Sequence, residues 1–206
     1  MIRNLTSLSF VALMTIGAPA LAQDTTTDEA PQESPTEAPA TDSPLDMGQP
    51  VADGPKLGER YSKAEYGDWN LACIKTEQEV DPCSLLQILT DPQGNAVAEV
   101  SLFRLQEGGQ AVAGATIIVP LESLLPAQVT VSVDGAPGKR YSYSFCNQIG
   151  CVAQIGLTQE DIDVFKKGNE ATVSLVPAPA PDQVISLPMS LAGFTAGYEV
   201  VDVVAQ

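Results

Sequence analysis

The sequence predicts an all-β fold, an antiparallel β-sandwich, with a barrel as the alternative. Short runs in which every second residue is apolar recur along the chain, and Gly, Pro, Asp and Asn separate them. The clearest run holds Tyr141, Tyr143 and Phe145 in alternation with polar residues, and it continues into Cys146, four further residues and Cys151. We interpret this stretch as a β-hairpin whose mouth is closed by a disulfide, in a fold that also contains one short helix.

The other expected strands show the same alternation, and ordered structure is expected to begin near Tyr66. The expected strands cover residues 69–73, 83–89, 96–105, 115–119, 129–133, 139–145, 152–155, 171–175 and 185–191, with a last edge strand in 193–201. Trp69 is expected to anchor the core near Cys73. Residues 91–95 and 134–138 have the composition of turns.

The one helix is predicted over residues 159–167. Thr158 is a good N-cap, and Asp161 three residues later forms a variant of the capping box. Acidic residues in the first turn and lysines in the last turn complement the helix dipole. Ile162 and Phe165 are three residues apart, so both should face the core.

Residues 1–22 have the pattern of a signal peptide. Arg3 precedes an apolar stretch at 8–16, and Ala-Leu-Ala at 20–22 is the small-residue pattern of a cleavage site, so the mature chain should begin near Gln23. The apolar stretch is shorter than the roughly 20 residues that a membrane span needs. The sequence therefore predicts a periplasmic protein, with secretion or association with the outer membrane as variants and an uncleaved N-terminal anchor as the alternative.

Residues 23–59 are predicted to be a disordered acidic tether rich in Pro and Thr. This stretch contains nine acidic residues, one lysine and no aromatic residue, so it lacks the apolar area needed to offset its ordering entropy. A spacer is the preferred interpretation, and a peptide-recognition role is the alternative. The folded domain is expected to cover residues 60–206.

The whole chain is strongly acidic. It holds 10 Lys and Arg against 26 Asp and Glu, for a net charge of −16. Nucleic acids and anionic lipid surfaces are disfavoured as partners, because both require clustered positive charge. The acidity is explained most simply by solubility.

Four cysteines in an exported chain predict two disulfides, and four cysteines allow three pairings. The local pairs Cys73–Cys83 and Cys146–Cys151 are preferred because each would close one hairpin. A redox-active pair is the weaker alternative, since such pairs are separated by two residues at a helix N-terminus. A zinc site made of all four cysteines is weaker still, because export favours oxidation.

Candidates for catalysis are few, because the chain contains no histidine. This excludes Ser-His-Asp and Cys-His nucleophile arrangements. The remaining candidates are two acidic clusters, Glu160, Asp161 and Asp163, and Glu77, Glu79 and Asp81. Helix capping and a solvated helix face explain the first cluster. The second is predicted to be a solvated loop, with calcium binding as the alternative. No metal or cofactor is expected.

The candidate residues for partner binding are Lys139, Arg140, Tyr141 and Tyr143. The two basic residues stand out in an acidic domain, beside aromatic side chains that would add contact area for an acidic partner. The alternative is that the basic pair faces outward and protects a strand edge from pairing.

Several motifs carry a resemblance to a known family. They are WNLAC at 69–73, SLLQI at 84–88 after Cys83, IIVPLESLL at 117–125, VSVDG at 131–135, FCNQIGCVA at 145–153, a short helix ending in KKG, and SLAGFTAGY at 190–198. In this order they resemble the invasion associated locus B family of exported bacterial proteins. The resemblance implies an immunoglobulin-like β-sandwich with two disulfides, periplasmic or secreted, and it implies no enzymatic activity.

The first functional hypothesis is a non-enzymatic exported protein of this type that binds a protein or a component of the cell envelope. Its basis is a well-specified scaffold without a catalytic constellation. A carboxylate-based hydrolase of cell-wall glycans is the second hypothesis. The third is a structural envelope-stress protein without a specific ligand.

Overall fold

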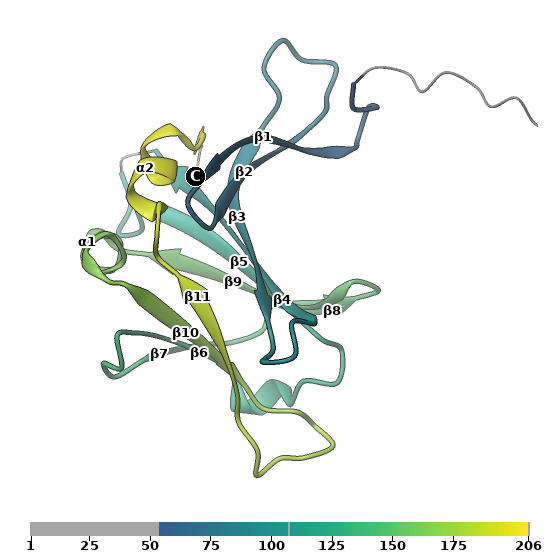
Figure 1. Ribbon diagram of the computed structural model, residues 1–206, viewed down its shortest axis with the longest axis vertical. Coiled ribbons are helices and arrows are strands. Elements are labelled where there is room, and N and C mark those ends of the chain that lie inside the picture. The colour runs from purple at the N-terminus through teal and green to yellow at the C-terminus, as the bar shows by residue number, and fades with distance from the viewer. Residues whose placement is uncertain (1–53, 107, 206) are drawn as a thin grey trace, which may run out of the picture. The chain divides into compact units, whose positions relative to one another are not determined.

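The structure is a computed structural model that describes residues 54–106 and 108–205 (Figure 1). The predicted signal peptide at 1–22 and residues 23–53 of the predicted tether lie outside this part of the chain. Within it, no helix is long and apolar enough to cross a bilayer.

Two β-sheets form the fold (Figure 1). The larger, eight-stranded sheet runs in the order β1 (Arg60–Tyr66), β2 (Trp69–Ile74), β3 (Cys83–Thr90), β4 (Ala96–Leu105), β5 (Ala113–Val119), β9 (Gly150–Leu157) and β8 (Phe145–Asn147), and β12 (Val203–Val204) pairs with β4. The four-stranded sheet runs in the order β11 (Ile185–Ser190), β10 (Glu170–Leu175), β6 (Val129–Val133) and β7 (Lys139–Tyr141). All neighbours are antiparallel except β12 and β4. The predicted immunoglobulin-like antiparallel sandwich is confirmed.

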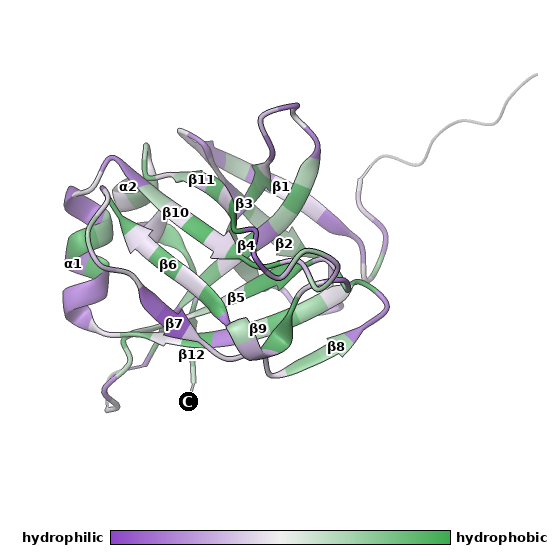
Figure 2. Cartoon of the chain, turned by 90° about the horizontal axis from the view of Figure 1, so that it is seen from below, coloured by the Kyte–Doolittle hydropathy of each residue, from purple (hydrophilic) through white to green (hydrophobic). Residues whose placement is uncertain are grey.

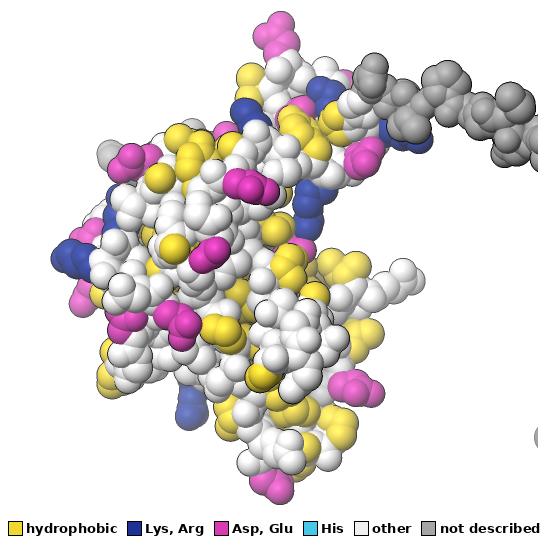
Figure 3. Space-filling model, viewed as in Figure 1, with side chains coloured by type: hydrophobic (Ala, Val, Ile, Leu, Met, Phe, Trp, Pro, Cys, Tyr) yellow, Lys and Arg dark blue, Asp and Glu magenta, His cyan; other side chains and the backbone are white. Residues whose placement is uncertain are grey.

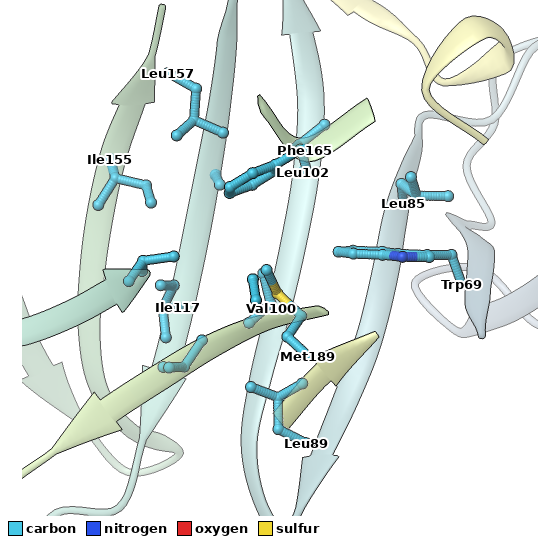
Figure 4. Close-up of a cluster of buried hydrophobic side chains, with 14 of the residues drawn as sticks. Trp69, Leu85, Leu89, Val100, Leu102, Ile117, Ile155, Leu157, Phe165 and Met189 are labelled. Carbon is cyan, nitrogen blue, oxygen red and sulfur yellow. The ribbon is translucent and has the colours of Figure 1, made fainter. Parts of the chain in front are cut away.

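The core lies between the two sheets. Figure 2 shows hydrophobic positions along the strands of both sheets and hydrophilic ones at β7 and on the predicted helix. Trp69, Ile117, Phe165 and Met189 come from both sheets and this helix, are buried, and meet in the core (Figure 4). Trp69 also donates a hydrogen bond from its ring nitrogen to the carbonyl oxygen of Ser190, so it anchors the core as predicted.

The predicted helix is present as α1 (Gln159–Lys167). Thr158 and Asp161 form the reciprocal capping box, and Ile162 and Phe165 are buried. The Thr158 hydroxyl accepts a hydrogen bond from the Asp161 amide, and the Asp161 carboxylate accepts one from the Thr158 amide. The capping box lies within four consecutive residues, 158–161, so it could be predicted from the local sequence alone.

The prediction of a C-terminal edge strand over residues 193–201 is wrong. The chain instead forms a second helix, α2 (Phe194–Val200), which begins after Gly193 in a left-handed conformation with φ of 83°. A Cβ at Gly193 would lie 2.0 Å from the carbonyl oxygen of Tyr66, so the close approach of two chain segments requires glycine there. Phe194 and Tyr198, four residues apart, then both face the core.

Two further boundaries differ from the prediction. Order was expected from Tyr66, but strand β1 already begins at Arg60. The single strand expected over residues 139–145 is two strands, because the chain leaves β7 in the smaller sheet and enters β8 in the larger one. The alternation of aromatic residues continues from β7 into β8, so the sequence pattern alone does not show that the chain changes sheets.

Both preferred disulfides are present. Cys73 bridges to Cys83 across β2 and β3, and Cys146 bridges to Cys151 across β8 and β9. Each pair occupies directly opposite positions of an antiparallel ladder, with Cα atoms 4.0 Å apart. The other two pairings of the four cysteines are therefore excluded in this structure.

Candidate interaction site

The four residues predicted for partner binding do not form one surface. Neighbouring residues of a strand point to opposite faces, so Arg140 faces away from Lys139 and Tyr141. The ammonium nitrogen of Lys139 lies 2.5 Å from a carboxylate oxygen of Asp161, and this hydrogen bond raises the pKa of Lys139. Tyr143 is half-buried, and burial raises the pKa of its hydroxyl. Lys139 and Arg140 are both exposed, but Arg140 belongs to no ion pair within the described residues.

A small hollow of about 210 Å³ lies between the β6–β7 hairpin and α1, and Lys139, Tyr141 and Asp161 line it. Burial raises the pKa of Asp161, but hydrogen bonds from Lys139 and Thr158 outweigh burial and leave that pKa below its ordinary value. The polar groups of the hollow thus hold the capping box and the hairpin together, which is a structural role.

The acidic loop between β2 and β3 is also internally bonded. Asp81 accepts hydrogen bonds from the Thr76 amide, from Tyr61 and from Lys75. The Thr76 amide is the main cause of a strongly lowered Asp81 pKa, which the Tyr61 and Lys75 side chains lower further against a smaller opposing effect of burial. Glu77 and Glu79 are exposed. Residues 54–106 and 108–205 contain no group of three or more Cys, Asp or Glu side chains arranged to hold a metal ion.

An apolar surface lies on the outer face of the larger sheet, and we call it the outer groove. A hollow of about 430 Å³ is lined by residues of β3, β4, β5 and the β8–β9 turn, among them Ile88, Val97, Ile118 and Ile149. A second hollow of about 250 Å³, lined by Ile74, Phe103 and Val204 among others, adjoins it, because Arg60 lines both. Figure 3 shows this side of the molecule recessed between the projection that carries β1 and the one that carries β8.

The register of the larger sheet determines which side chains form the floor of the outer groove. Ile88 pairs with Glu99 and Glu99 pairs with Ile118, so these three side chains form a row across β3, β4 and β5. Their neighbours along each strand point into the core, since side chains alternate between the two faces. A row of two isoleucines on the solvent face is unusual for a half-buried sheet and marks a surface suited to binding.

One ion pair crosses the outer groove. The Arg60 guanidinium makes two hydrogen bonds, of 2.8 and 3.1 Å, to the Glu99 carboxylate. Both side chains are partly exposed, so the pair contributes little to stability. Its consequence for binding is that the groove carries no net charge at its centre.

The β8–β9 hairpin forms one rim of the groove. Ile149 at its turn is 69% exposed and Phe145 is 48% exposed. Gly150, directly after the turn, packs against β5, where a Cβ would lie 2.4 Å from the carbonyl oxygen of Val119. The Cys146–Cys151 bridge fixes the two strands of the hairpin behind this apolar tip.

Sequence reasoning missed the outer groove. A signal was present, because Leu86 and Ile88 place apolar side chains on the face of β3 opposite the core, and Val97 and Ile118 do the same in β4 and β5. Apolar residues on both faces of neighbouring strands indicate either a fully buried strand or an exposed binding face.

Fold and site together define a disulfide-bonded immunoglobulin-like β-sandwich with an uncovered apolar groove. The family model described as invasion associated locus B protein matches residues 69–202. The chain belongs to the invasion associated locus B family, as its motifs indicated.

Known relatives agree with this assignment. Invasion protein B homologs from two strains of Brucella abortus are 22% identical over 134 residues, which cover 65% of this chain and 75% of each homolog. The crystal structure of invasion associated protein B from Bartonella henselae superposes with a TM-score of 0.55 at 21% identity, over 65% of this chain and 89% of that one. This likeness supports the fold. The relatives are named as invasion proteins and not as enzymes.

Proposed function

We propose that the chain is an exported, non-enzymatic interaction protein that binds a protein component of the cell envelope through the outer groove. The observation that carries the proposal is the group of apolar side chains on the outer face of the larger sheet, Ile88, Val97, Ile118 and Ile149, that line a hollow in the described part of the chain. The two disulfides fit an oxidising compartment outside the cytosol. The invasion protein names of the relatives fit a protein that acts by binding.

The groove has the physical properties of a binding surface. Burying an exposed isoleucine side chain contributes about 2 kcal/mol, so Ile88 and Ile149 together offer a partner several kcal/mol of hydrophobic stabilisation. The hairpin and the sheet beneath are rigid elements, one of them closed by a disulfide, so little ordering entropy opposes association.

The carboxylates favour binding over glycan hydrolysis. Five aspartates accept hydrogen bonds from backbone amides and so hold loops and helix ends in place. They are Asp81, Asp91, Asp134, Asp161 and Asp202. A glycosidase needs one carboxyl group whose pKa is raised so that it can act as an acid. The pKa values of Asp81 and Asp91 are instead lowered, mainly by the Thr76 amide and by the Asn95 side chain respectively. At Asp161 burial raises the pKa, but hydrogen bonds from Lys139 and Thr158 outweigh burial and lower it.

The remaining parts of the chain extend this proposal. We place a signal peptide at 1–22, the acidic tether at 23–59 and the folded domain at 60–206, in a protein that works in the periplasm. Arg140 and the neighbouring Lys139, Tyr141 and Tyr143 are proposed as a secondary contact for an acidic group of a partner. In this role Arg140 is the freest of the four, because Lys139 is already paired with Asp161.

Capture from envelope extract tests the proposal. The processed chain, tagged and secreted with both disulfides formed, should retain a defined protein in saturable fashion, and Ile88→Asp should abolish retention. Val184→Asp is the matched control, since Val184 is 64% exposed and lies outside the groove. Retention that is equal for wild type, Ile88→Asp and Val184→Asp would contradict the proposal, as would no saturable retention by the wild type.

A further inference from the structure

We infer that the partner of the outer groove is a second copy of this chain, whose β8–β9 hairpin enters the groove. The inference rests on the proposed function of the groove as a binding surface and names its occupant. Three observations carry it: the composition of the hairpin, the neutrality of the groove, and the position of the hairpin at the rim of the groove.

The hairpin belongs to a long uncharged stretch of an acidic protein. Residues 142–159 contain no Asp, Glu, Lys or Arg, in a chain with a net charge of −16. At the tip of this stretch Ile149 is 69% exposed, and Phe145 stands on the adjacent strand. Insertion of the hairpin into the groove therefore buries hydrophobic surface and desolvates no ionised group of the hairpin itself.

The groove matches the hairpin. Its larger hollow of about 430 Å³ is lined mainly by aliphatic residues, and its two charged residues, Arg60 and Glu99, neutralise each other. Because the two charges of this bidentate pair cancel, the groove offers no net electrostatic attraction to a strongly charged occupant. An uncharged, isoleucine-tipped segment leaves the pair intact.

The position of the hairpin makes the contact self-complementary. Ile149 lines the groove from its rim and remains largely exposed, so the same chain presents the insert and the recess side by side. Figure 3 shows the recess open to solvent between its two projections. A two-fold axis passing beside the rim places each hairpin in the groove of the other copy, and such an isologous contact closes as a dimer.

Net charge gives this dimer a distinctive salt dependence. Two copies of this strongly acidic chain repel each other at long range, so screening by salt should strengthen their association. A basic partner would show the opposite dependence, because its attraction to the acidic chain is screened.

Sedimentation equilibrium of the processed, disulfide-bonded chain tests the inference. The wild type should show a monomer–dimer equilibrium that shifts toward dimer as sodium chloride is raised. Each dimer buries two copies of Ile149, and loss of each costs at least tenfold in affinity, so Ile149→Asp should raise the dissociation constant by about a hundredfold. Ile88→Asp should act similarly from the groove side, and Val184→Asp should have no effect.

Crosslinking between two differently tagged chains tests the geometry. An Ile149→Cys chain mixed with a Val97→Cys chain should form a covalent heterodimer, because the hairpin tip of one copy would meet the groove floor of the other. Ile149→Cys mixed with Val184→Cys should not. Circular dichroism of each variant should match the wild type, which separates loss of association from loss of folding.

Two results would overturn the inference. One is a wild-type chain that remains monomeric at high concentration and high salt, and the other is a dimer that survives both Ile149→Asp and Ile88→Asp. If the monomeric chain still captures a different envelope protein in a way that Ile88→Asp abolishes, the proposed function stands and only the identity of the occupant is wrong. If it captures nothing, both fail.

Discussion

The two disulfide-bonded hairpins, β2–β3 and β8–β9, lie in different surroundings, and their disulfides have different structural roles. Cys73 and Cys83 are 0% and 7% exposed and belong to the hydrophobic core. Cys146 is exposed, and only its partner Cys151 is buried. One bridge therefore lies within the core, and the other fixes a hairpin that projects at the rim of the outer groove.

Loop length does not explain this difference. The bridges span sequence separations of 10 and 5, and in the chain-entropy model both contribute about 2–3 kcal/mol. Their surroundings differ much more, since β2 and β3 sit between β1 and β4, whereas β8 is the last strand of its sheet. We conclude that burial, more than covalent closure, decides what each bridge does for the protein.

Replacing Cys73 and Cys83 by serine should have the largest effect. Loss of the bridge costs about 2.5 kcal/mol, and each serine hydroxyl placed in the core costs about 1 kcal/mol more. We expect the free energy of unfolding to fall by about 4–5 kcal/mol, measured by urea denaturation. A variant with alanine at both positions removes the bridge without the hydroxyls and should lose less. If the serine and alanine pairs were equally destabilised, burial of the bridge would not matter.

Replacing Cys146 and Cys151 by serine should have a smaller effect. Only one of the two serines is buried, so a loss of about 2–3 kcal/mol is expected. Amide exchange should accelerate in residues 145–150 and remain slow in β2 and β3. Destabilisation as large as that of the Cys73 and Cys83 variant would show that the rim hairpin supports the core directly.

Elements that depend on a local sequence pattern could be predicted, and elements that depend on long-range contacts could not. The core hairpin was predictable because Trp69, Cys73 and Leu85 alternate with more exposed residues, which is a local pattern. The α2 helix was not, because its start depends on contact between Gly193 and Tyr66, which are far apart in sequence. Strand pairing and close backbone approach are long-range, so no short window of sequence contains them.

Candidate site residues were predicted less well for a related reason. Lys139 and Arg140 stood out by charge, but a strand places neighbouring residues on opposite faces and Asp161 pairs with Lys139. The outer groove gathers Ile88, Ile118 and other residues from four chain segments. Each is an ordinary apolar residue in its own strand, and only the register of the sheet shows that they share a face.

The loop of the core hairpin should respond to acid. Asp81 has a pKa below its ordinary value in the folded chain, so its ionisation stabilises the native state at pH values above about 4 and this contribution is lost as the pH falls further. Asp81→Asn should lower the melting temperature at pH 7 by less than either disulfide variant. The difference between wild type and Asp81→Asn should shrink below about pH 4. A difference that stays constant down to pH 2 would show that Asp81 is not ionised in the native loop.

Substitutions at the tips of the two hairpins should have the smallest effect on stability, and only one of them should affect association. Val80 and Ile149 are 68% and 69% exposed, so aspartate at either position should change the free energy of unfolding by less than about 0.5 kcal/mol. Only Ile149 lines the outer groove, so Ile149→Asp should abolish association while Val80→Asp preserves it. Urea denaturation and sedimentation of the same two samples measure both properties. Because the tips match in exposure and differ in position, equal loss of association in both variants would place the binding surface outside the groove.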